Sequence, residues 1–424
     1  MELMTKQDYK QTEVGLIPED WDVFNLGQKC NTYSGGTPPT SNKANYDGDI
    51  PWISSSELNK KKIYETKGFI SELGLNSSSA KIVPQNTFLL AMYGATAGVS
   101  AITRISGAIN QAVLAFESDM ILAEYLYNFF SLRKEYIILT YCQGGQPNLS
   151  GSIVKSIKIP LPPTLEEQKA IATALSDVDD LISNLDALIV KKKAIKQGAM
   201  QQLLTPPHKG GKRLDGFDGE WVETPLDDLL SKYQNGYSFS AKGYEDNGVP
   251  IVTMAQIGLQ GQFQFNSNKV NYWSASDLKF LNDFVLTKGD LIMSMTDVTP
   301  NKNLIGRMTI IEENGPLLLN QRVGHLIINK DKVNSTVLKH LSNMRRWRTY
   351  CKSIASLGVQ ANIGTTDIKN GTFILPSIEE QNAIATVLVD MDKEIEDLST
   401  KKEKYAQLKQ GMMQELLTGK TRLV

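Results

Sequence analysis

Two long segments of the chain, residues 164–205 and 377–418, carry apolar side chains at alternating spacings of four and three residues. Such a heptad-like stripe is typical of a helix that packs along one face against a partner helix. The first stripe consists of Ile171, Leu175, Val178, Ile182 and Leu185. The second stripe consists of Ile384, Leu388, Met391, Ile395 and Leu398. The pattern predicts two long helices that pair as a coiled coil.

The two segments are copies of one another. They align without a gap at a constant offset of 213 residues, and 21 of 42 positions are identical. Each copy begins with a capping box, Thr164-x-x-Glu167 or Ser377-x-x-Glu380, whose glutamate is expected to reach back to the N–H of the cap residue. A chain that repeats itself can fold with an internal pseudo-two-fold, which would make the two helices antiparallel.

A glycine stands at the same place in both helices, as Gly198 and Gly411. Glycine inside a helix costs about 1 kcal/mol relative to alanine, so its presence in both copies suggests that another element approaches closely. If the helices overlap along their whole length, the two glycines would face Ile384 and Ile171. The alternative is an inherited glycine with no packing role.

Each helix closes a longer block, at about 21–163 and 221–376, and the two blocks share landmarks but little sequence. A turn that leads into an apolar strand occurs at residues 84–92 and 287–295, and an Asn-Gln pair precedes a further strand-like run at residues 110 and 320. A helical pattern lies near 121–140 and again near 334–355. These features predict an α+β fold for each block. Because the helices have stayed alike while the blocks have diverged, we expect the blocks to recognise different things.

Composition and charge set broad limits. With 424 residues the chain is too long for one core, and no run of 18 apolar residues or signal peptide is present. Three widely spaced cysteines fit a reducing cytoplasm. The net charge is −1, but the two helical segments carry −1 and −4, which leaves +4 on the remaining chain. That surplus is compatible with contact between the blocks and DNA, and equally with none.

Sequence signatures of catalysis are absent. No P-loop, dinucleotide-binding or HExxH motif occurs, nor the Asn-Pro-Pro-aromatic tetrapeptide that marks amino-methyltransferases. An acidic group in the first helix has counterparts in the second and is most simply a solvated helix face. The group comprises Asp177, Asp179 and Asp180, with Asp390 and Asp392 as counterparts. We therefore expect no catalytic residue, metal site or cofactor in this chain, whose role is to bind and to position.

Basic side chains that could hold DNA phosphates form two short runs. They are Lys60, Lys61 and Lys62 in the first block, and Arg345 and Arg348 in the second. Lysine and arginine supply the salt-sensitive part of DNA affinity. An ordinary charged surface is the alternative for both runs, and only some of the arginines can face one partner if the stretch is helical.

Polar side chains in loops are candidates for base contacts. The segments Gly-x-Gln-x-Asn occur at residues 144–148 and 358–362, and Gln and Asn can read adenine bidentately in the major groove. They can equally cap backbone groups in a turn. The candidates in and around these loops are Tyr93, Thr96, Gln111, Gln146 and Asn148 in the first block, and Thr296, Gln321, Arg322, Gln360 and Asn362 in the second.

Four elements of the chain together resemble the specificity (S) subunits of type I restriction–modification systems. They are residues 10–21 (Lys-Gln-Thr-Glu-Val-Gly-Leu-Ile-Pro-Glu-Asp-Trp), residues 216–221 (Gly-Phe-Asp-Gly-Glu-Trp), the two Pro-x-x-Glu-Glu-Gln helix starts and the two Gln-x-Leu-Leu-Thr helix ends. The match extends over nearly the whole chain, and the order of the elements makes it specific.

The resemblance implies two tandem target-recognition domains separated by two long antiparallel helices. Each domain would read one half of a bipartite, asymmetric site on double-stranded DNA. The stripes and glycines of the helices would serve helix pairing or the interface with two methyltransferase (M) subunits, which bring S-adenosylmethionine. Restriction (R) subunits would complete the ATP- and Mg-dependent nuclease, so these cofactors are expected on partner subunits, and the complex is expected in the cytoplasm without a membrane.

This interpretation divides the chain into five parts. Residues 1–163 form an N-terminal arm and the first recognition domain, 164–205 the first spacer helix, and 206–220 a linker. Residues 221–376 form the second recognition domain, and 377–424 the second spacer helix and a tail. The competing interpretation is a coiled-coil scaffold whose two domains bind ligands other than DNA.

Overall fold

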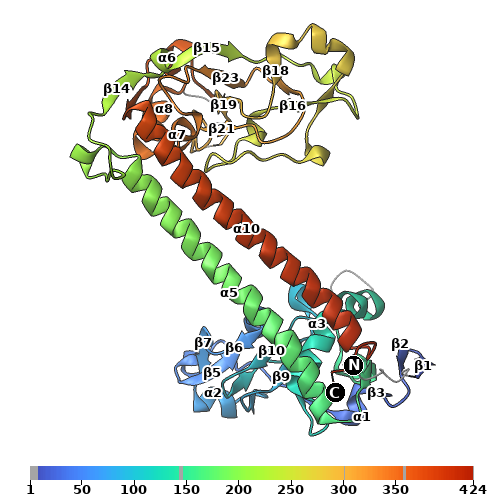
Figure 1. The fold of residues 1–424 in the computed structure, drawn as a ribbon. Helices are drawn as coiled ribbons and strands as arrows, with labels where there is room; N and C mark the ends of the chain where they lie inside the picture. The colour runs from blue at the N-terminus through green and yellow to red at the C-terminus, as the bar shows by residue number, and fades with distance from the viewer. Residues whose placement is uncertain (1–7, 143–146, 300, 357–359, 424) are drawn as a thin grey trace. The chain divides into compact units, whose positions relative to one another are not determined.

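The computed structural model describes residues 8–142, 147–299, 301–356 and 360–423. The chain divides into two compact units, unit 1 with residues 1–187 and 399–424, and unit 2 with residues 188–398. Two long helices, α5 (Leu165–Leu203) and α10 (Ile378–Leu416), each contribute to both units (Figure 1). The prediction of two long helices from the apolar stripes is thus confirmed, within two residues at each end.

Unit 1 is built on two sheets, with strand orders β4-β12-β9-β10-β6 and β7-β5-β11-β8. The strands are β4 (Asn31–Ser34), β5 (Ile50–Ile53), β6 (Lys62–Ile63), β7 (Gly68–Ile70), β8 (Lys81–Val83), β9 (Phe88–Ala91), β10 (Ser100–Thr103), β11 (Gly107–Ile109) and β12 (Val113–Glu117). All four residues of β9 are buried because side chains alternate across a strand that has a core on each face. Phe88 and Leu90 join the core that includes α3 (Ala123–Tyr141), and Leu89 joins a second core with Ile53 and Val83.

Unit 2 repeats this topology, except that its first sheet has no counterpart of β6 among the described residues. Its sheets have strand orders β15-β23-β19-β21 and β17-β16-β22-β18. The strands are β15 (Leu230–Asn235), β16 (Val249–Val252), β17 (Tyr272–Trp273), β18 (Val285–Leu286), β19 (Leu291–Ser294), β21 (Met308–Ile310), β22 (Leu317–Leu319) and β23 (Val323–Ile328). The strands predicted after residues 84 and 287 are β9 and β19, and those predicted after the Asn-Gln pairs are β12 and β23. The α+β prediction with two tandem domains is confirmed.

A two-stranded ladder joins the beginning of each block to its end. In unit 1, β3 (Asp22–Asn25) pairs antiparallel with β13 (Lys158–Leu161), and in unit 2, β14 (Val222–Pro225) pairs with β25 (Thr372–Leu375). A short helix then follows the first strand, α1 (Leu26–Lys29) or α6 (Leu226–Leu229). The ladders bring the start of each block next to the residues that lead into a long helix.

The helix predicted near 334–355 differs from its counterpart. Its place is taken by α7 (Ser335–Leu341) and α8 (Arg345–Ile354), whereas α3 is continuous. Ser342 lies at the break, where its hydroxyl donates to the Lys339 carbonyl and accepts from the Met308 N–H of β21. A serine side chain that competes for backbone groups in this way favours a helix end.

The long helices run antiparallel within each unit and are joined by ion pairs. In unit 1, Lys409 lies 2.5 Å from Asp179, and in unit 2 the same positions of the repeat, Lys196 and Asp392, form the corresponding pair. The expectation that these two aspartates belong to a merely solvated helix face is therefore wrong. The ten residues of the two apolar stripes are buried or half-buried. The stripe thus faces protein in both units.

The glycines of the long helices do not mark a close approach. A Cβ added to Gly198 or Gly411 would meet no heavy atom within 4 Å, and both residues are exposed. The expectation that Ile384 lies close to Gly198, and Ile171 close to Gly411, is therefore wrong. Both glycines lie on the exposed side of their helices.

Gly198→Ala is accordingly expected to raise the free energy of unfolding by about 1 kcal/mol, since alanine has the better helix propensity and nothing obstructs its methyl group. Thermal unfolding of the full chain measures the effect. Gly211→Ala is the control with the opposite sign, because its Cβ would lie 1.7 Å from the Thr205 carbonyl oxygen. A lower melting temperature for Gly198→Ala would show that the glycine is needed for packing.

The predicted capping boxes are only half correct. The hydroxyls of Thr164 and Ser377 accept hydrogen bonds from the N–H groups of Glu167 and Glu380, at 3.2 and 3.4 Å. The two glutamate side chains do not reach back to the cap. They are almost fully buried and pair with arginines, Glu167 with Arg422 and Glu380 with Arg213. Each arginine lies in the segment that follows the other long helix.

Candidate nucleic-acid interface

Three loops of unit 1 meet at the end of strand β9. The N–H of Met92 donates to the Ala112 carbonyl (2.9 Å), and the Met92 carbonyl accepts from the Leu149 N–H (2.8 Å). Tyr93, which is 39% exposed, forms an antiparallel bridge with Asn148. We call this place the three-loop edge of unit 1. It brings together the candidates Tyr93, Thr96, Gln111 and Asn148 from three distant parts of the sequence.

Unit 2 has the same arrangement at the end of β19. The N–H of Met295 donates to the Arg322 carbonyl, and the Met295 carbonyl accepts from the Ile363 N–H, both at 3.0 Å. The next residues form a two-stranded ladder of β20 (Thr296–Asp297) and β24 (Ala361–Asn362), in which Thr296 pairs with Asn362. This three-loop edge of unit 2 unites the candidates Thr296, Gln321, Arg322 and Asn362.

The Asn-Gln pair forms the same turn at both edges. The side-chain oxygen of Asn110 accepts from the Ala112 N–H, and that of Asn320 accepts from the Arg322 N–H, both at 3.1 Å. Asparagine favours such turns because its side-chain oxygen can accept a hydrogen bond from the backbone N–H two residues later in the chain. The turn leaves the next residue, Gln111 or Gln321, exposed.

A glycine permits each turn to lie against a neighbouring strand. A Cβ on Gly35 would stand 1.8 Å from the Ile109 carbonyl oxygen, and one on Gly236 would stand 2.1 Å from the Asn320 carbonyl oxygen. Only glycine allows so close an approach of two backbones. Sequence reasoning missed both residues, although each follows a strand at an offset of about 200, like the tryptophans that open the blocks.

Asp297, which follows the candidate Thr296, holds the backbone of the loop beside this edge. It is 1% exposed, and its carboxylate accepts from the N–H groups of Thr299, Leu304 and Ile305 at 2.5–3.2 Å. Burial acts to raise the pKa of Asp297, but these backbone amides outweigh it and hold the pKa below its ordinary value. The charged side chain fixes the loop that follows β20.

The lysine run does not form one free cationic patch. Lys60 pairs with Glu57 at 2.8 Å and donates to the Glu65 carbonyl, and Lys62 is half-buried in β6. Lys61 is 66% exposed but lies 3.7 Å from Asp179 of α5. The expectation of three lysines acting together is therefore not supported, because Lys60 is ion-paired within the fold and Lys62 is half-buried.

The arginine run also separates. Arg348 is 8% exposed and donates to the carbonyls of Ile305, Lys302 and Asn303. Burial lowers the pKa of its guanidinium from the ordinary value. These bonds hold the loop before β21, so Arg348 is a structural residue and the expectation of a phosphate contact is not carried forward. Arg345 remains exposed at the start of α8.

Three other candidates complete the set. Thr296 is buried and its hydroxyl contacts the Met254 sulfur, so its side chain holds the loop. Gln360 is half-buried, and its backbone carbonyl accepts a hydrogen bond from the side-chain amide of Asn362. Gln146 lies outside the described residues.

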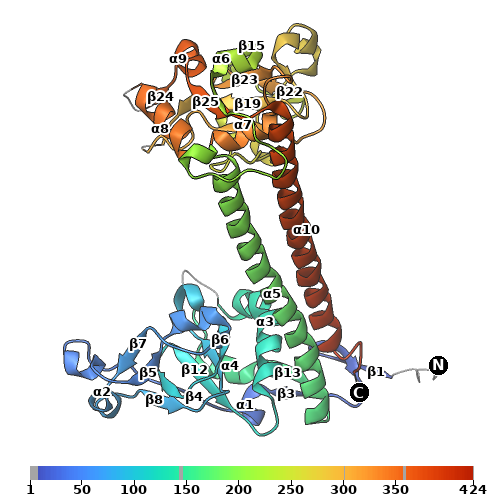
Figure 2. The same ribbon diagram turned by 60° about the vertical axis from the view of Figure 1, so that its left-hand side comes forward.

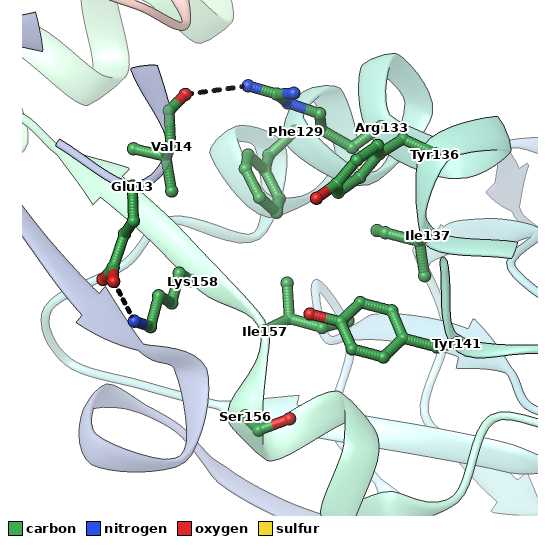
Figure 3. Close-up of a pocket in the computed structure, with 10 residues that line it drawn as sticks. All are labelled: Glu13, Val14, Phe129, Arg133, Tyr136, Ile137, Tyr141, Ser156, Ile157 and Lys158. Carbon is green, nitrogen blue, oxygen red and sulfur yellow. Dashed lines mark hydrogen bonds and ion pairs between the residues drawn. The ribbon is translucent and has the colours of Figure 1, made fainter. Parts of the chain in front are cut away.

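A cavity of about 210 Å³ lies elsewhere in unit 1, between α3 and the hairpin of β1 (Tyr9–Thr12) and β2 (Gly15–Pro18). Figure 3 shows that its charged groups already have partners: Glu13 pairs with Lys158, and Arg133 donates to the Val14 carbonyl at 3.4 Å. These contacts fasten the hairpin to α3 and β13. The cavity is therefore a packing gap beneath the β1–β2 hairpin, and its lining residues do not form a catalytic arrangement.

Within the described ranges, no group of three or more His, Cys, Asp or Glu side chains could hold a metal ion. Over the same residues, no helix is both long and apolar enough to cross a membrane. The described cysteines are free thiols, and burial raises the pKa of Cys30 to about 11 and of Cys351 to about 12.

Comparison with known proteins decides the family. The model of the type I restriction modification DNA specificity domain matches twice, at residues 18–191 and 218–410, which is most of the chain. The chain belongs to this family. The two matches coincide with the two blocks and their helices, so the duplication read from the sequence is a duplication of the family's domain.

Curated relatives and solved structures agree with the family. The type I restriction enzyme MjaVIII specificity subunit of Methanocaldococcus jannaschii is 28% identical and is aligned over 100% of this chain and 98% of its own length. The MjaIX specificity subunit of the same organism is 38% identical over 64% of this chain and 66% of its own length. The fold is similar to that of the type I restriction–modification S subunit from M. genitalium, with a TM-score of 0.55, 12% identity and 98% coverage of both chains.

Proposed function

We propose that this chain is the DNA sequence-specificity subunit of a type I restriction–modification complex, and that each domain reads one half of a bipartite, asymmetric site. The observation that supports this is the three-loop edge, built twice on one backbone frame on which some positions differ: exposed Tyr93 corresponds to buried Thr296, and exposed Arg322 corresponds to half-buried Ala112. A shared backbone frame with partly different side chains fits two domains that read the same polymer with different base preferences.

The alternative is a scaffold whose domains bind ligands other than DNA. Gel shifts of the chain with its methyltransferase partner separate the two at low and moderate salt. A DNA reader should bind duplex DNA with an affinity that falls as salt rises, because lysine and arginine contacts release counterions. Absence of a shift at low salt would favour the scaffold.

The proposed role is recognition, and the chemistry belongs to partners. Methyltransferase subunits would bring S-adenosylmethionine, and restriction subunits would bring ATP and Mg for cleavage. Cytoplasmic DNA is the proposed substrate of the complex. The free thiols of Cys30, Cys142 and Cys351 suit a reducing compartment.

A repeated exposed surface on the long helices is the proposed docking site for the methyltransferase subunits. Some residues of the run 196–205 are identical in the two copies because they make contacts inside the chain. Lys196 forms an ion pair with Asp392, and Leu203 and Leu204 belong to a hydrophobic core. Gln197, Gly198 and Gln201 are exposed, yet they too are identical in the second copy, as Gln410, Gly411 and Gln414. We call each set a docking face, and two equal faces suit two copies of one partner.

The double variant Gln197→Arg with Gln201→Arg places two arginines on one docking face. We expect it to weaken the binding of one methyltransferase subunit by at least about tenfold, because two bulky charged side chains would lie in the centre of the interface. Native mass spectrometry should then show one bound partner in place of two. Asn184→Arg is the control, at an exposed α5 position where the two copies differ. Undiminished binding of two partners would place the interface elsewhere.

A further inference from the structure

The exposed glutamine is the feature that the two three-loop edges share most closely. Gln111 and Gln321 follow the same Asn-stabilised turn, beside a glycine whose backbone touches that turn. Both are exposed, and neither is part of a hydrophobic core. A side chain that is equal in two readers of unlike half-sites cannot distinguish those half-sites.

The surroundings of Gln111 determine which of its atoms is available. The Thr37 hydroxyl donates to the Gln111 side-chain oxygen, so the amide oxygen is engaged and the amide nitrogen is left as a donor. Thr37 stands two residues after Gly35, and a hydroxyl residue, Ser238, stands two residues after Gly236. The Gln321 N–H donates to the Tyr237 carbonyl at 2.9 Å, so the segment that carries Ser238 lies beside Gln321.

We propose that Gln111 and Gln321 are positioning residues that donate an amide N–H to an oxygen of the DNA backbone, one in each half-site, and that they do not read a base. This inference rests on the proposed function. Bidentate recognition of adenine needs both the oxygen and the nitrogen of the amide, whereas a phosphate needs only a donor. An exposed arginine, Arg322, directly follows Gln321 and adds charge for the same acceptor.

A comparison of the affinities for specific and non-specific DNA distinguishes a backbone contact from base reading. The experiment uses the full chain assembled with its methyltransferase partner and two duplexes of equal length. One duplex carries the motif that the wild-type complex methylates, and the other a scrambled version of it. Gln111→Ala and Gln321→Ala are each expected to weaken binding about tenfold, as for a lost hydrogen bond to a charged group, and equally for both duplexes.

Two further variants sharpen the result. Gln111→Glu keeps an acceptor for Thr37 but removes the donor and adds a negative charge, so it should weaken binding more than alanine does. Gln11→Ala removes an exposed glutamine from β1, which lies away from β9 within unit 1 (Figures 1 and 2), and should leave both affinities unchanged.

A loss confined to the motif-bearing duplex would overturn the proposal in favour of base reading. Unchanged binding to both duplexes by both alanine variants would overturn it in favour of a role inside the turn. A wild-type complex that binds the two duplexes equally well would instead contradict the proposed function, which keeps the two failures distinct.

Discussion

Replacing Arg422 by alanine is expected to lower the free energy of unfolding by about 3 kcal/mol, because it leaves the buried carboxylate of Glu167 without its partner. Glu167 is 1% exposed at the start of α5, and Arg422 lies 2.6 Å from its Oε2 atom. Arg422 also pairs with Asp20 at 3.0 Å. The estimate takes the lower end of the range for buried pairs because the Arg422 side chain is 20% exposed.

The net contribution of the pair differs from the cost of breaking it. Burial raises the pKa of the Glu167 carboxyl, and Arg422 acts against that rise. Loss of Arg422 removes the opposing effect, so the carboxylate must be protonated or hydrated in the folded chain. Replacing both members, as in Glu167→Gln with Arg422→Ala, should therefore recover much of the stability.

Chemical denaturation of the full chain measures these differences. Lys420→Ala is the matched control, since Lys420 lies 3.9 Å from Glu415 in an exposed pair of the same terminal segment and should contribute little. Equal stabilities of the Arg422→Ala and Lys420→Ala chains would mean that the buried pair does not hold the segment to α5.

Gly35→Ala is expected to cost about 3 kcal/mol and to disable the three-loop edge of unit 1. The new methyl group would meet the Ile109 carbonyl oxygen at 1.8 Å, and a backbone obstacle cannot move aside as a side chain can. The end of β4 must then separate from the Asn110 turn, where the Gly35 N–H donates to the Asn110 carbonyl at 3.2 Å. The estimate is the upper end of the range for overpacking.

Gly151→Ala provides the control in the same unit, because a Cβ there would meet nothing within 4 Å and the residue begins the short helix α4 (Gly151–Ser156). Unfolding reports the stability, and DNA binding of the assembled complex reports the edge. Wild-type affinity and stability for Gly35→Ala would show that the turn tolerates displacement and does not position DNA contacts.

The local features of the fold were predictable from the sequence. Periodicity gave the two long helices, and the constant offset gave their equivalence, because a helix depends on residues close together in the chain. Hydroxyl caps at Thr164 and Ser377 were predictable for the same reason. The strand runs at 88–91 and 291–294 followed from apolar residues after a turn signal.

Long-range partners were not predictable. The pairing of Glu167 with Arg422 joins residues 255 positions apart, and a capping-box motif gives no sign that its glutamate will turn inward to an arginine. Charge alone likewise failed to separate Arg345 from Arg348, since burial under the loop before β21 is decided by tertiary packing. The lysines at 60–62 illustrate the same limit: a run of equal charges divided into ion-paired and exposed members.

The fold brings the candidate residues of separate loops together in space. Sequence reasoning named Tyr93, Gln111 and Asn148 separately, and hydrogen bonds to Met92 place their loops at one edge. The repetition of that edge around Met295 could have been anticipated from the aligned turns, but the close approach of Gly35 and Gly236 required the sheet topology.

Two domains with the same backbone frame and partly different exposed side chains should read two different half-sites of DNA. Methylome sequencing of a host that lacks other modification systems, carrying this chain with its methyltransferase partner, tests it most directly. We expect one new motif with two different halves separated by a fixed gap of unspecified bases. A continuous motif, a motif with identical halves or no new methylation would contradict it.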